Sequence, residues 1–190
     1  MQISIMYGSY RQGRLGIRVV RHIQRQLQDR GHEVVVLDAM EKQLPFLDKR
    51  YMDYQPEQAP EVLREISNTI SRSDALVIVT GEYNHSVPPG LKNLMDHFFH
   101  EYRFRVAGIV SYSVGPIAGM RVAPHLRAIC GELGMVTVPT MIGIGGVKET
   151  LDETGNRTDG KGGKALEKFV QEIEWYAEAL KAARERGLPY

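Results

Sequence analysis

A short polar segment near the start of the chain, GSYRQGRLG, carries the residues best suited to bind an anion. Gly8 and Gly13 allow the backbone to wrap closely around a ligand. Ser9 can donate a hydroxyl hydrogen bond, and Arg11 and Arg14 can add charge-assisted bonds to phosphate oxygens. A helix that begins directly after this segment would add free N–H groups and the positive end of its dipole. The segment therefore predicts a phosphate-binding loop.

Two better-known phosphate motifs do not fit this loop. Two of its glycines have the spacing of the Walker A motif, but Arg14 replaces the lysine and Leu15 replaces the metal-binding hydroxyl residue, which excludes an NTPase. The dinucleotide fingerprint requires glycine where this chain has Tyr10. Asp38 lies where a ribose-binding acid would be expected, and without the glycine pattern we interpret it as a loop cap. An ordinary strand–helix turn with surface arginines is the alternative interpretation of the loop.

The elements around this loop alternate between strands and helices. Apolar, largely β-branched segments predict five strands: Gln2–Tyr7, Glu33–Asp38, Ala75–Thr80, Arg105–Ser113 and Met135–Val138. Apolar residues at helical spacing predict five helices: Leu15–Asp29, Glu61–Ser71, Pro88–His100, Ala118–Glu132 and Lys164–Glu185. Parallel strands need crossover helices, and right-handed crossovers place these helices on both faces. The order predicts one domain over residues 1–190, a three-layer α/β/α sandwich with a five-stranded parallel sheet. Loops are predicted at 41–60 and 143–163.

Two more loops of unusual composition follow the carboxyl ends of predicted strands, where ligands bind in open parallel sheets. In the second loop, Gly81–Pro89, the residues Glu82, Tyr83 and Asn84 form a turn. This turn offers backbone polar groups, an amide and an aromatic ring, which suit a flat heterocycle. The third loop, Ser113–Gly119, contains glycines that permit a close approach to a planar ring.

Residues 82–96, EYNHSVPPGLKNLMD, resemble the signature of the NADPH-dependent FMN reductase family. The first loop resembles the phosphate loop of that family, and the order of elements extends the resemblance over the whole chain. The chain differs at Gly81, where many members have proline, and at Arg14 and Gly16, where many have serine and asparagine. The resemblance implies a flavodoxin-like fold.

The resemblance also implies a set of residues that bind FMN. Ser9, Arg11 and Arg14 would hold the phosphate, and Gly16 belongs to the same loop. The residues implied to meet the flavin ring or its ribityl chain are Glu82, Tyr83, Asn84, Ser113 and Gly115.

The reaction implied is hydride transfer from NADPH, or NADH, through bound FMN to a small acceptor: a quinone, an azo compound, free flavin or a similar molecule. No catalytic side chain is predicted, because the cofactor carries the chemistry. The alternatives are a flavodoxin-like electron carrier and a non-catalytic protein of the same fold. The 24 basic and 23 acidic residues argue against the carrier, since such carriers usually dock through an acidic surface.

Composition places the chain among ordinary globular proteins. It has 190 residues, 43% of them hydrophobic, and a formal net charge of +1, which gives no indication of nucleic-acid binding. No signal peptide or membrane-spanning stretch is evident, and one cysteine, Cys130, which we interpret as a buried thiol, allows no internal disulfide. We expect a cytoplasmic protein. The resemblance implies a homodimer or homotetramer, and Trp175, off the apolar stripe of the last helix, is a candidate contact residue.

Three histidines attract attention without defining a site. The spacing of His97 and His100 could serve a metal, but no third ligand accompanies them, so we predict no metal site and interpret them as a solvated or interface pair. His85 lies within the signature and could approach the substrate, although the polarity of a turn explains it equally well.

Overall fold

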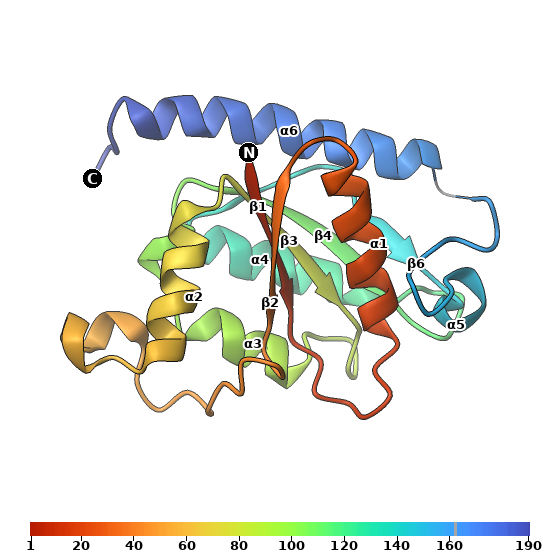
Figure 1. The fold of residues 1–190 in the computed structure, drawn as a ribbon, viewed down its shortest axis with the longest axis horizontal. Coiled ribbons are helices and arrows are strands. Elements are labelled where there is room, and N and C mark those ends of the chain that lie inside the picture. The colour runs from red at the N-terminus through yellow and green to blue at the C-terminus, as the bar shows by residue number, and fades with distance from the viewer. Residues whose placement is uncertain (162) are drawn as a thin grey trace.

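The fold is described by a computed structural model that covers residues 1–161 and 163–190. Its centre is a parallel sheet with the strand order β2-β1-β3-β4-β5, with β6 also paired to β4 (Figure 1). The strands are β1 (Gln2–Tyr7), β2 (Glu33–Asp38), β3 (Ala75–Thr80), β4 (Val106–Tyr112), β5 (Val136–Thr137) and β6 (Ile142–Ile144). Because every pairing is parallel, all strand carboxyl ends lie at one edge of the sheet.

Helices cover both faces of this sheet, as the sequence predicts. They are α1 (Gly16–Gln28), α2 (Glu61–Arg72), α3 (Pro89–Asp96), α4 (Ala123–Glu132), α5 (Val147–Thr150) and α6 (Gly163–Glu185). Apolar residues of α1 and α6 pack on one face against β1, β3 and β4, and those of α2, α3 and α4 form a second core on the other face. The three-layer α/β/α arrangement is confirmed.

The fifth strand position differs from the prediction because it holds two short strands instead of one. β5 pairs with Val106 and Ala107 at the start of β4, and β6 pairs with the end of β4. Pro139 lies between β5 and β6 and has no N–H to donate, so the ladder is interrupted there. The carbonyl groups of Val138 and Pro139 accept hydrogen bonds from Arg127 at 3.0 and 2.9 Å.

Two helices are shorter than predicted. The helix predicted to reach His100 ends at Asp96, and shortly beyond it the Phe99 amide donates to the Glu101 carboxylate at 3.1 Å. The helix predicted from Ala118 begins at Ala123, because Ala118 and Gly119 have positive φ angles of 58° and 67° that a right-handed helix excludes.

The two predicted loops contain local order. The 41–60 loop includes 3₁₀ turns at Tyr51–Asp53 and Pro56–Gln58, and the 143–163 loop includes most of β6 and all of α5. Residue 162, which falls in the second loop, lies outside the described residues. The long apolar stretch needed to cross a bilayer occurs in none of the helices of the described ranges.

Two side-chain predictions from the sequence are confirmed and one is wrong. Cys130 is fully buried, and burial raises the pKa of its thiol to about 12. Trp175 is 67% exposed on α6, off the apolar stripe as predicted, and its role in a subunit contact stays a prediction. The solvated histidine pair is wrong, because His97 is buried with its Nδ1 2.8 Å from the Asn93 carbonyl oxygen, whereas His100 is exposed.

Candidate active site

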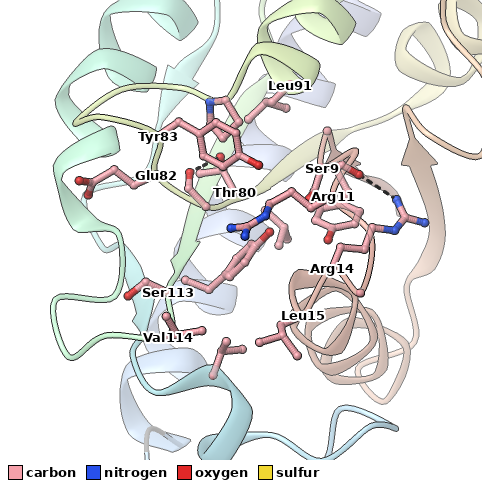
Figure 2. A pocket seen from close by; sticks show the side chains of 18 of the residues that line it. Ser9, Arg11, Arg14, Leu15, Thr80, Glu82, Tyr83, Leu91, Ser113 and Val114 are labelled. Atoms are coloured by element: carbon pink, nitrogen blue, oxygen red, sulfur yellow. Dashed lines mark hydrogen bonds between the residues drawn. The ribbon is translucent and has the colours of Figure 1, made fainter.

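A cavity of about 310 Å³ opens at the carboxyl edge of the sheet, where the three loops converge (Figure 2). The first loop contributes one wall, the second loop another, and Ser113 and Val114 of the third loop lie at one side of its mouth. Val147, at the start of α5, completes the lining. This is the edge at which open parallel sheets bind ligands.

The first loop is fixed by a close backbone contact with the start of α3. A Cβ added at Gly8 would lie 2.2 Å from the backbone N and Cα of Leu91, and one added at Gly90 would lie 2.2 Å from the Gly8 carbonyl oxygen. Only glycine fits at both positions. The Tyr10 hydroxyl also donates to the Ala39 carbonyl at 2.7 Å, which ties the loop to the end of β2.

The two arginines of the first loop have different surroundings. Arg14 donates to the Asp38 carboxylate at 2.6 Å and to the Ser9 carbonyl at 3.1 Å, and its guanidinium points away from the cavity (Figure 2). Arg11 extends across the cavity instead, and within the described ranges it forms no salt bridge. Arg11 is therefore the arginine whose charge is available to a ligand.

Asp38 caps the loop, as the sequence predicts, and also forms an ion pair with Arg14. Its Oδ1 accepts a hydrogen bond from the Met40 amide at 3.1 Å, and the carboxylate is almost fully buried beneath Arg14. Burial alone would lower the pKa of Arg14, but the hydrogen bond and charge of Asp38 outweigh it and raise that pKa.

The second loop presents mainly Tyr83 and backbone to the cavity. Tyr83 and Ser86 exchange backbone hydrogen bonds of 3.0 and 2.9 Å, and the intervening Asn84 and His85 have positive φ angles. The Glu82 side chain points away from the cavity and forms a salt bridge of 2.7 Å with Arg121. Glu82 thus links the second loop to the 3₁₀ turn that follows the third loop.

The third loop is closed by its own hydrogen bonds. The Ser113 hydroxyl donates to the Gly115 carbonyl at 2.8 Å, and the Ser113 carbonyl accepts from the Val147 amide at 3.1 Å. These contacts bring Ser113 and α5 to the cavity.

Six of the nine predicted site residues line the cavity: Ser9, Arg11, Arg14, Glu82, Tyr83 and Ser113. Gly16, Asn84 and Gly115 are neighbours of lining residues and do not line it themselves. In the described part of the chain, no group of three or more metal-binding side chains occurs.

Sequence analysis did not identify two tyrosines that form part of the cavity wall. Tyr7, at the end of β1, is fully buried, and its Oη has no hydrogen-bond partner among the described residues. Tyr112, at the end of β4, packs against Gly16, where an added Cβ would lie 2.2 Å from the phenol Cζ and Oη. Both residues are the last of their strands, a position that signals the ligand edge in a parallel sheet, and this signal could have found them.

The chemistry of this donor set fits a phosphate-bearing aromatic ligand. Arg11 supplies a positive charge, Ser9 a hydroxyl, and Tyr7 a buried polar atom without a hydrogen bond of accepted geometry in the described part of the chain. The cavity lining otherwise includes apolar groups, among them Val79, Pro88, Leu91 and Val147.

Comparison with known proteins identifies the family. The family model described as NADPH-dependent FMN reductase matches residues 1–149. The chain belongs to this family. The match confirms the predicted resemblance and, with it, the predicted class of FMN- and NAD(P)H-dependent oxidoreductase.

The names of individual relatives are consistent with this family assignment. A quinone reductase from Escherichia coli (strain K12) is 30% identical over 172 residues, which cover 88% of this chain and 86% of that protein. A 2-hydroxy-1,4-benzoquinone reductase from Burkholderia sp is 35% identical over 118 residues, or 58% of this chain. The chain spans 64% of the length of that relative.

A solved structure supports the fold class. The flavoenzyme NAD(P)H:(acceptor) oxidoreductase FerB from Paracoccus denitrificans matches with a TM-score of 0.74 over 93% of this chain and 97% of its own. At 23% identity this likeness shows the fold alone. A flavodoxin from Pseudomonas aeruginosa matches with a TM-score of 0.53 over 95% of this chain and 99% of its own, which confirms the predicted flavodoxin-like architecture.

Proposed function

We propose that this FMN reductase family member binds FMN in the cavity and uses NAD(P)H to reduce a quinone or a similar two-electron acceptor. When bound, FMN supplies the chemistry of accepting a hydride from NAD(P)H and passing it on. The overall reaction consumes NAD(P)H, a proton and a quinone and yields NAD(P)⁺ and a hydroquinone. Quinone reduction is proposed because relatives that cover most of this chain are named quinone reductases.

The observation that carries the proposal is the position of Arg11. Its guanidinium lies over the cavity and has no carboxylate partner among the residues described, while the cavity is lined by three loops and by strand ends at the ligand-binding edge of the sheet. An arginine placed in this way favours a phosphate ligand, because guanidinium groups form charge-assisted hydrogen bonds to phosphate oxygens.

The other residues of the proposed site have positioning and packing roles. Ser9 adds a hydroxyl and backbone beside Arg11, and Tyr83 offers an aromatic ring against which a flavin could pack. Arg14 and Glu82 act through protein contacts, the first with Asp38 and the second with Arg121. The nine-residue set, including Gly16, Asn84, Ser113 and Gly115, remains our proposal for the FMN site.

An absorbance and turnover measurement tests the proposal. The purified chain, reconstituted with FMN, should retain the flavin absorption bands after desalting and should oxidise NADPH or NADH when a benzoquinone is added. A flavin-bound chain that consumes no nicotinamide cofactor would indicate the carrier alternative. A colourless chain after reconstitution would contradict flavin binding altogether.

We propose further that the chain works as a single domain and a cytoplasmic homo-oligomer. Large exposed apolar residues occur in the loops that follow the carboxyl ends of β2, β3 and β4: Met40, Phe46, Leu47, Tyr83, Val114, Ile117 and Met120. Exposed apolar residues of this kind favour association between copies. Light scattering should give the wild-type protein at least the mass of a dimer. Phe46→Glu should lower the measured mass, whereas Leu188→Glu, near the exposed end of the chain, should not. A monomeric wild-type protein would contradict the proposal.

A further inference from the structure

Two tyrosines from different strands meet in the wall of the cavity. Tyr7 is the last residue of β1 and Tyr112 the last residue of β4, and both line the cavity although β3 lies between their strands. The Tyr112 ring crosses toward the first loop. Its Cζ and Oη lie where a side chain at Gly16 would begin, so its hydroxyl is held against the first residue of α1.

Both hydroxyls are hydrogen-bond donors at physiological pH. Burial raises the pKa of Tyr7 and of Tyr112 above the ordinary value for a phenol. The hydroxyls of Tyr7 and Ser9, and the charge of Arg11, act on the pKa of Tyr112 in the opposite direction, because this phenol lies close to Tyr7 and to the first loop. Neutral phenols at this place can donate to an anion and do not repel it.

The Tyr7 hydroxyl forms no hydrogen bond of accepted geometry within the described residues, although the hydroxyls of Tyr112 and Ser9 lie close enough to influence its pKa. Its Oη is shielded from solvent and has no partner of acceptable geometry. A buried hydroxyl left without a partner costs free energy that a ligand acceptor would recover. Tyr10, three residues away, illustrates the contrast, because its hydroxyl donates to the Ala39 carbonyl.

We propose that the hydroxyls of Tyr7 and Tyr112 form a donor pair for the phosphate of FMN and make the site selective for the flavin nucleotide over riboflavin. Gly16 contributes to this arrangement, because a glycine has no side chain and leaves the space that the Tyr112 phenol occupies. This inference rests on the proposed FMN site.

Flavin titration of single hydroxyl deletions tests the donor pair. The full-length protein, freed of flavin, is titrated with FMN and separately with riboflavin, and binding is followed by flavin fluorescence. Tyr112→Phe and Tyr7→Phe keep the rings and remove one hydroxyl each. Tyr102→Phe is the matched control, because Tyr102 is also fully buried with an unpartnered hydroxyl but belongs to the second core, away from the cavity lining.

The expected result is a loss of roughly ten-fold in FMN affinity for each cavity variant, the scale of one hydrogen bond to a charged group. Riboflavin affinity should stay within about two-fold of wild type, and Tyr102→Phe should bind both ligands as wild type does. Equal losses for FMN and riboflavin, or an equal loss in Tyr102→Phe, would overturn the donor pair.

Two further outcomes separate this inference from the function on which it rests. A Tyr112→Ala variant that binds FMN more tightly than wild type would mean that the phenol fills the phosphate position, and would overturn the donor pair alone. A wild-type chain that binds neither flavin would overturn the proposed function as well.

Discussion

Two arginines three residues apart in the first loop face opposite environments. Arg14 is mostly buried against Asp38, whose carboxylate would otherwise lie in the interior without a counter-charge. Arg11 is exposed and spans the cavity. From the sequence, both arginines are equivalent candidates for phosphate binding. In the structure, the buried carboxylate of Asp38 engages Arg14 and leaves Arg11 for the ligand.

Substitution of Arg11 should affect ligand binding and leave folding unchanged. Arg11→Ala should weaken FMN binding by about 1.5–3 kcal/mol, because a charged hydrogen bond to the phosphate is lost. Its melting temperature should match wild type, since the side chain forms no salt bridge within the described residues. Arg186→Ala, at an exposed position near the chain end, is the control. Unchanged flavin retention in Arg11→Ala would place the phosphate elsewhere.

Substitution of Arg14 should affect folding first. Arg14→Ala leaves the Asp38 carboxylate buried without its counter-charge, and we expect a loss of about 3 kcal/mol in the free energy of unfolding. Denaturant unfolding measures this loss. Lys42→Ala breaks the exposed pair with Glu65 and should cost less than about 1 kcal/mol. Equal stability of the two variants would refute the structural role of Arg14.

At the scale of elements, local patterns predict most of the fold. The residues of α1 that the apolar stripe selects, from Gly16 to Leu27, are buried as expected. The patterns fail where tertiary contacts override them. The helix after Pro88 ends at Asp96, because the residues that follow it bond to the Glu101 carboxylate and pack into the second core. No periodicity in the sequence predicts those contacts.

One side chain of the family signature helps to hold the loop predicted at 41–60. Asn93 on α3 donates to the Pro45 carbonyl at 2.8 Å and accepts from the Leu47 amide at 2.9 Å. Asn93 belongs to the signature segment 82–96, and its amide holds backbone groups of a loop 46 residues away in the sequence.

Removal of this amide should loosen the loop without unfolding the sheet. Asn93→Ala should speed hydrogen exchange of the Leu47 amide by roughly ten-fold or more, since its hydrogen-bond acceptor is lost. The amides of β3 should exchange as in wild type, and Gln171→Ala on the exposed face of α6 should change neither. Protection at Leu47 that survives in Asn93→Ala would contradict the assigned role.

At the scale of the whole molecule, the last helix is tied back to the first quarter of the chain. Glu174 on α6 accepts from Arg30 at 2.8 and 2.6 Å and lies 2.8 Å from the Nε2 of His32. The hydrogen bonds from Arg30 lower the pKa of Glu174 below its ordinary value of 4.5, although partial burial opposes them. A lowered carboxylate pKa contributes stability that is complete above 4.5 and is lost as the pH falls through the folded-state pKa.

The interaction of Glu174 with Arg30 and His32 can be tested by measuring the free energy of unfolding as the pH is lowered. Between pH 6 and pH 3, wild type should lose roughly 1 kcal/mol more of its free energy of unfolding than Glu174→Gln, whose side chain cannot titrate. Glu178→Gln, one turn further along α6 and exposed, should follow wild type. Parallel stability curves for wild type and Glu174→Gln would show that the pair contributes nothing.

Much of the site could be predicted from the sequence because its residues follow strand ends. Ser9, Arg11 and Tyr83 were identified from the composition of loops at one edge of a parallel sheet. Tyr7 and Tyr112 lie within strands, so the composition of the loops does not select them, and only their place at the strand ends could have pointed to them. Their meeting depends on the strand order and on the space left by Gly16.

The bare-backbone contact between Gly8 and the Gly90–Leu91 peptide has a consequence for the kinetics of nucleotide capture. Main chain in close contact has no rotamers to lose when a ligand arrives, so the ordering entropy that opposes binding is largely that of exposed side chains such as Arg11. Encounter should then proceed in a single fast phase, and differences among flavins should appear almost wholly in how long each one stays.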